Sequence, residues 1–129
     1  MNKKQKLRYY LYLILFAIIS FAFIPFSKAE AASLKEAMEL DKNGFYEEAI
    51  KQWEKLQLES TVNIKFFAGL KIYGNNAKLG NLNRAEEVSK ALTLSYPQQY
   101  ESWFAYANAS GALKKYSQAI SAFKKSIAL

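Results

Sequence analysis

The feature that most constrains this fold is a helical pattern that recurs between Tyr46 and Phe123. The first residue of the pattern returns after 36 residues and again after 34. Repetition at such a fixed period indicates a stack of similar helical units, each unable to bury its apolar face alone. Three positions repeat together, and they are occupied by Tyr46, Leu82 and Tyr116, by Ala49, Ala85 and Ala119, and by Trp53, Ser89 and Phe123.

Each repeated position has an expected packing role. The alanines should let the second helix of a unit approach the first closely, because their side chains are small. The residue three positions before each alanine should fill the turn that precedes the helix. The residue four positions after each alanine should fill the gap toward the next unit. In the middle unit this last position is Ser89, which departs from the large residues of the other two units.

The apolar spacing predicts six helices and no strand, which is an all-α fold. Polar residues before three of these helices suggest N-caps, namely Ser33 (paired with Glu36 in a capping box), Asn63, and Asn83. Gly44 and Gly80 should end two helices, because glycine tolerates the left-handed turn. The predicted helices cover 33–42, 45–58, 64–79, 83–95, 98–115 and 116–129.

Residues 1–29 have a different character from the rest. A basic start is followed by residues 9–27, which contain no charge, and then by small residues up to Ala31. This order is typical of a secretory signal, with cleavage expected after Ala29 or Ala31. An uncleaved membrane anchor is the alternative, since the apolar stretch is nearly long enough to span a bilayer. In either case we expect residues 30–129 to be exported, periplasmic or secreted, or anchored in the inner membrane and facing outward.

The net charge of +7 belongs mostly to the N-terminal segment. Residues 1–29 hold five of the 18 basic residues and no acid, which leaves 13 basic and 11 acidic residues in 30–129. The exported part is therefore only +2, and a nucleic-acid partner is not expected. The chain has no Cys and no His, so disulfides, Cys/His zinc sites and histidine bases are excluded. No metal or other cofactor is expected.

The sequence resembles three tetratricopeptide repeats, at about residues 31–62, 63–97 and 98–129. The third repeat matches best, with Trp103 in the place of the family's first-helix Trp. In the second repeat Gly69 replaces that Trp, and the bulky Tyr73 stands where the family has a small residue; in the first repeat Ser33 replaces the Trp. The resemblance implies a right-handed α-solenoid of helix–turn–helix units, preceded here by the N-terminal signal or anchor helix. The matching repeat-packing residues are Tyr46, Ala49, Trp53, Leu82, Ala85, Trp103, Tyr116, Ala119 and Phe123.

The resemblance also implies a function in protein–protein interaction. In tetratricopeptide proteins the first helices line a concave groove that holds a peptide or a partner's helix. The basic clamp with which some members hold a C-terminal carboxylate is largely missing here. The groove candidates carried over to this chain are Leu34, Met38, Asp41, Leu70, Lys78, Phe104 and Asn108.

Catalysis finds little support in the sequence. Neighbouring glutamates such as Glu47 and Glu48 diverge on a helix, and no phosphate loop, nucleophile elbow or metal-spaced carboxylate set is present. We therefore expect a non-enzymatic adaptor, scaffold or assembly factor that binds a protein or peptide partner, with a small enzyme as the least favoured alternative.

A second non-enzymatic hypothesis concerns the ends of the stack. No residue follows the last predicted helix to cap it, so part of its apolar stripe, formed by Ile120, Phe123 and Ile127, should meet water. Self-association through this helix would cover the stripe. The alternative function is then a structural accessory subunit, held to the membrane by residues 9–27 if the signal is uncleaved and associating through its end faces.

Overall fold

The computed structural model describes residue 5 and residues 27–129, and in this part of the chain it contains six α-helices and no strand. The predicted all-α fold is confirmed. The predicted apolar signal or anchor helix lies almost entirely outside the described residues, among which no helix is long and apolar enough to cross a membrane. The helices are α2 (Lys28–Lys42), α3 (Tyr46–Glu59), α4 (Val62–Lys78), α5 (Leu82–Ser95), α6 (Tyr100–Ala112) and α7 (Tyr116–Ile127).

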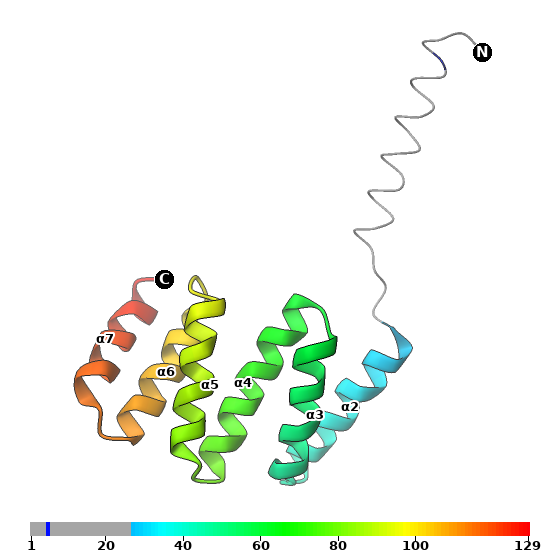
Figure 1. Cartoon of the computed structure of the whole chain (residues 1–129), viewed down its shortest axis with the longest axis horizontal. Helices are drawn as coiled ribbons and strands as arrows, with labels where there is room; N and C mark the ends of the chain where they lie inside the picture. The colour runs from blue at the N-terminus through cyan, green and yellow to red at the C-terminus, as the bar shows by residue number, and fades with distance from the viewer. Residues whose placement is uncertain (1–4, 6–26) are drawn as a thin grey trace.

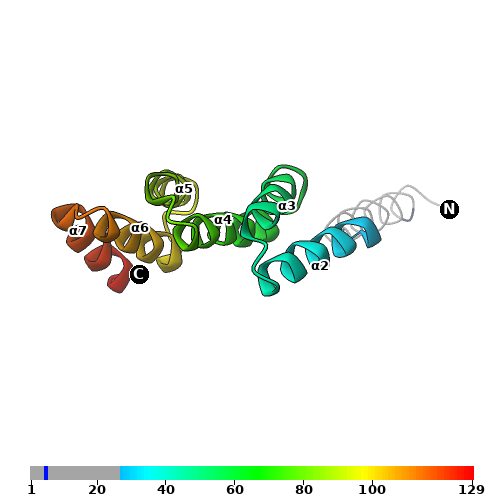
Figure 2. The same ribbon diagram turned by 90° about the horizontal axis from the view of Figure 1, so that it is seen from below.

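The helices form a row in which each packs against the next. Consecutive helices run in opposite directions from α2 at one end to α7 at the other (Figure 1). Helices α3 and α5 lie on one side of α2, α4 and α6 (Figure 2). Contact between α4 and α6 adds a link between non-consecutive helices. The arrangement follows from the short connections, because a short loop places each helix directly beside the one before it in the chain.

Three helix ends share one turn geometry. Gly44 and Gly80, which follow α2 and α4, have φ angles of 78° and 77°, as predicted for glycine-terminated helices. Lys114 occupies the equivalent place after α6 with φ 61°. In each turn two backbone N–H groups return to carbonyls of the last helical turn, as in Gly44 to Asp41 and Phe45 to Leu40. The third turn therefore adopts the same left-handed conformation with a lysine, for which this conformation costs more free energy than it does for glycine.

Three of the six predicted helix starts, at residues 33, 64 and 83, were placed too late. The first helix begins at Lys28 and is capped by Ser27, whose hydroxyl accepts a hydrogen bond from the Glu30 N–H at 3.0 Å. The predicted capping box at Ser33 is therefore wrong, since Ser33 lies inside α2. The prediction placed residues 27–32 at the end of the signal segment and not in a helix, although Lys, Ala and Glu are strong helix formers.

Two other predicted caps lie inside the first turns of their helices. Asn63 follows the actual cap Thr61 of α4, and Asn83 follows the actual cap Asn81 of α5. The side chains of Thr61 and Asn81 make no capping hydrogen bond. A polar side chain therefore does not mark where either helix begins. The fifth predicted helix is also shorter than expected, because the turn at Lys114 ends it at Ala112.

The core differs between the two halves of the row. In the first half, large side chains are buried, among them Trp53 at 0% and Ile72 at 1% exposure. Around α5 to α7 the buried residues are mostly Ala, Ser and Thr, while larger apolar side chains such as Phe104, Ile120 and Ile127 remain exposed. Small residues allow close helix packing but bury little apolar area, so the first half carries most of the hydrophobic stabilisation.

Candidate functional site

The α2, α4 and α6 helices carry the predicted groove residues on a surface that we call the first-helix face. Met38 and Phe104 are 50% and 51% exposed on this face. Lys78 and Asn108 are also exposed, whereas Leu34, Asp41 and Leu70 are partly buried. Leu34 packs against the core of the first half. The face thus exposes two large apolar side chains, while three of the seven predicted residues are partly buried.

Asp41 is the most constrained of these residues, because its carboxylate joins three helices. It accepts a hydrogen bond from the Trp53 indole N–H of α3 at 3.1 Å and another from the Asn75 side-chain amide of α4. The Lys71 ammonium, also on α4, lies 3.2 Å from the same carboxylate. The Asp41 side chain is only 10% exposed. The Asp41 carboxylate therefore holds α2 to α3 and α4, and it has little remaining capacity to bind a ligand.

The predicted groove residues did not include Phe67 and Lys71, which lie beside Trp53. The Phe67 ring is 39% exposed and meets the edge of the Trp53 indole at a centroid distance of 5.5 Å. The Lys71 ammonium lies 5.5 Å from the centre of the Phe67 ring, a cation–π contact. Together they form an exposed aromatic and cationic spot. The helical spacing from Phe67 to the predicted Leu70 and Lys78 could have indicated that all share one face.

Two predicted polar contacts of the groove are partly used inside the protein. The Lys78 ammonium sits 4.6 Å from the ring centre of Tyr46 at the start of α3. The Asn108 side-chain amide donates to the Phe104 carbonyl one turn earlier in α6, at 3.0 Å. Its side-chain carbonyl remains on an exposed residue and can still accept from a partner.

The repeated positions show how the units pack. Ala49 and Ala85 are fully buried and Ala119 is 5% exposed. Trp53 is buried, while Tyr46, Leu82, Trp103 and Phe123 are partly buried. Tyr116 is 64% exposed, so its predicted role of filling the turn before α7 is wrong. The turn before α7 closes through backbone hydrogen bonds, including Lys115 N–H to the Ser110 carbonyl, and leaves the Tyr116 ring outside.

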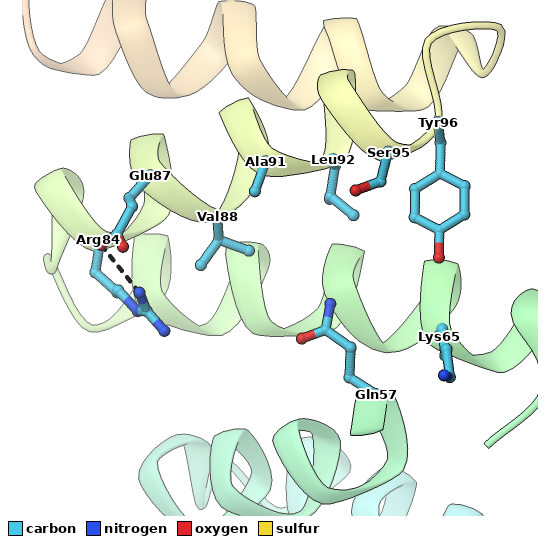
Figure 3. Close-up of a pocket in the computed structure, with 9 residues that line it drawn as sticks. All are labelled: Gln57, Lys65, Arg84, Glu87, Val88, Ala91, Leu92, Ser95 and Tyr96. Carbon is cyan, nitrogen blue, oxygen red and sulfur yellow. Dashed lines mark ion pairs between the residues drawn. The ribbon is translucent and has the colours of Figure 1, made fainter. Parts of the chain in front are cut away.

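A cleft of about 320 Å³ lies between α3, α4 and α5, away from the predicted groove residues (Figure 3). Its apolar wall is formed by α5. Its polar side chains come from α3, α4 and α5 and from Tyr96, which follows α5. Arg84 at one end pairs with Glu87 at 2.9 Å and with Glu54 at 3.7 Å. The hydrogen bond with Glu87 raises the pKa of Arg84, so the guanidinium stays charged. The cleft is lined by Gln57, Lys65, Arg84, Glu87, Val88, Ala91, Leu92, Ser95 and Tyr96.

The geometry offers no metal centre in the described part of the chain. Residues 27–129 contain no group of three or more His, Cys, Asp or Glu side chains placed to hold a metal ion. The chain matches no protein-family model, and no curated protein is significantly similar to it.

Proposed function

We propose that the chain is a non-catalytic interaction module, a right-handed solenoid of three tetratricopeptide-like repeats that binds a segment of a partner protein on its first-helix face. The observation that carries this proposal is the exposure of Met38, Phe67 and Phe104 along α2, α4 and α6. Exposed apolar side chains on successive helices offer anchor points for a partner helix or extended segment.

The polar groups of the face suit a partner segment with acidic or amide side chains beside its apolar ones. Lys71 and Lys78 are its cations, and Asn108 offers a side-chain carbonyl. The Asp41 contacts to α3 and α4 hold the face in one arrangement before a partner arrives. A preorganised surface binds more tightly because less ordering entropy is lost on association.

The proposed place of action is the cell envelope. The N-terminal pattern of a basic start, an uncharged apolar stretch and small residues supports export, with residues 30–129 outside the cytoplasm. Cleavage after Ala29 or Ala31 would remove Ser27 and its hydrogen bond to the Glu30 N–H. The rest of α2 would persist, because its buried side is formed by later residues such as Ala37.

A second candidate function, association through the end of the row, is favoured by one observation. Ile120, Ile127 and Leu129 are 55%, 85% and 46% exposed on and beside α7. An accessory subunit that docks by this end face onto a copy of itself or a larger partner would bury them.

The experiment that separates the two functions compares matched pairs of substitutions in a tagged chain. Met38→Glu with Phe104→Glu alters the first-helix face, and Leu58→Glu with Leu94→Glu alters leucines of α3 and α5 that are more exposed still, at 80% and 77%. A third variant, Ile127→Ser, alters the end face. Crosslinking in the cell followed by purification gives the partner bound by each variant, and circular dichroism checks that each is folded.

We expect the partner to be lost from the Met38 and Phe104 variant and kept by the Leu58 and Leu94 variant. Retention by a folded Met38 and Phe104 variant would contradict binding on the first-helix face. Loss from the Ile127 variant alone would instead support association through the end face.

A further inference from the structure

The cleft between α3, α4 and α5 has a counterpart one repeat earlier. A smaller cleft of about 200 Å³ lies between α2 and α3 and is lined partly by Lys55, Leu56, Glu59 and Ser60. Each of these residues stands 36 positions before a residue of the larger cleft, and those residues are Ala91, Leu92, Ser95 and Tyr96. The two clefts are therefore the same place in successive repeats.

One repeated position near this place carries a different side chain in each repeat. The residues at that position are Ser33, Gly69 and Trp103. In the third repeat the Trp103 indole donates to the Pro97 carbonyl at 2.9 Å, and the Lys125 ammonium lies 5.9 Å from its ring centre. Lys125 is the counterpart of Ala91. The third repeat also has a cleft, of about 350 Å³, which is lined by Trp103 and by Gln118, Ser121 and Ala122, the counterparts of Arg84, Glu87 and Val88.

Gly69 lies under two of the side chains that line the middle cleft. A Cβ atom at this position would lie 2.5 Å from Leu92 Cδ2 and 3.0 Å from Gln57 Nε2. Both side chains, which line the cleft, therefore lie directly on the glycine backbone. The volume that remains is at the lower end of the range for small-molecule sites, about 300 to 1,000 Å³.

The middle cleft combines an apolar wall with a polar end. Val88, Ala91 and Leu92 form the wall. At the polar end, the Tyr96 hydroxyl points from the end of α5 toward α4, where Lys65 is located (Figure 3). The Tyr96 ring is held by packing against Phe66 at a centroid distance of 4.9 Å.

The cations of the cleft differ in availability. Arg84 is engaged by Glu87 and Glu54. Lys65 makes no ion pair with any residue of 27–129, so its ammonium group is the cation available to a ligand. The smaller cleft has the opposite balance, with two acids, Glu30 and Glu59, and only Lys55 as a cation.

We propose that the middle cleft binds a small monocarboxylate that carries a short apolar chain. The carboxylate pairs with Lys65 and accepts a hydrogen bond from the Tyr96 hydroxyl, while the chain lies on Val88, Ala91 and Leu92. The acidic cleft of the first repeat rejects the same ligand by charge. This site is separate from the first-helix face, so the proposal does not depend on partner binding there.

Titration of the isotope-labelled full chain with hexanoate, followed by amide NMR shifts, tests the proposal. Hexanamide is the uncharged probe of the same size. We expect shifts around Gln57, Lys65 and Tyr96, none around Glu30 and Glu59, and binding of hexanoate about 10-fold tighter than of hexanamide.

Three variants assign the contacts. Lys65→Gln should remove the preference for hexanoate over hexanamide, whereas Lys90→Gln, the same charge change on an exposed residue of α5, should keep it. Ala91→Phe should block the cleft without disturbing the core, since Ala91 is exposed at its rim. The proposal is overturned by equal binding of the two probes, by absence of binding, by shifts centred on another part of the protein, or by unchanged binding to a folded Ala91→Phe variant.

Discussion

Replacement of Asp41 by alanine tests the polar contacts that hold α2 to α3 and α4. Its carboxylate accepts hydrogen bonds from the Trp53 indole and the Asn75 amide, and it pairs with Lys71. Trp53 and Asn75 are 0% and 2% exposed, so neither donor can turn to water when its acceptor is removed. Lys71 is 37% exposed in its side chain and can regain hydration.

The expected cost of Asp41→Ala follows from these three partners. A buried donor left without an acceptor costs about 1–3 kcal/mol, and two such donors remain here. The exposed part of the Lys71 pair adds little, because solvent screens it. We expect the free energy of unfolding to fall by about 3–5 kcal/mol, the range found when one partner of a buried polar cluster is removed.

Urea denaturation followed by circular dichroism measures this loss. Trp53→Phe removes one of the two buried donors, so Asp41→Ala should cost about 1–2 kcal/mol less in that background. Glu47→Ala, on an exposed residue in the first turn of α3, is the control and should change stability by less than about 0.5 kcal/mol. A cost for Asp41→Ala close to that of the control, or the absence of coupling with Trp53, would refute the reasoning.

Three further predictions concern the backbone and pH. Lys114→Gly should raise the free energy of unfolding by about 0.5–1 kcal/mol, because Lys114 has φ 61°; a loss of stability in urea denaturation would contradict this. Gly74→Ala should raise it by up to about 1 kcal/mol, because Gly74 lies inside α4 with nothing within 4 Å of an added Cβ; an unchanged urea midpoint would argue against it. Burial raises the pKa of Tyr73 above 10.0, so the folded state keeps this proton after the unfolded state has lost it, and stability should fall as pH rises above about 10. Urea midpoints compared below and above this pH should show a smaller fall for Tyr73→Phe than for the unaltered chain, and an equal fall would exclude Tyr73 as a cause.

The sequence alone determined the helical class, the number of helices in the described part and the places where two of them end. These features depend on local chemistry, namely apolar residues at helical spacing and glycine at left-handed turns. The same reasoning failed at helix starts, since Ser33, Asn63 and Asn83 have side chains suited to caps but lie inside their helices. A capping side chain is equally compatible with the first helical turn, and only packing of the whole helix decides where it begins.

Tertiary structure decided which of the exposed and charged side chains are free to act. Asp41 reads in sequence as an available groove acid, yet residues from two other helices, 12 and 34 positions away, occupy its carboxylate. Gly69 reads as a departure from the repeat pattern, and only the tertiary structure shows that Leu92 and Gln57, which line the cleft, pack directly on its backbone. Such contacts join residues far apart in the chain, so their distances depend on how the helices stack, which periodicity along one helix does not specify.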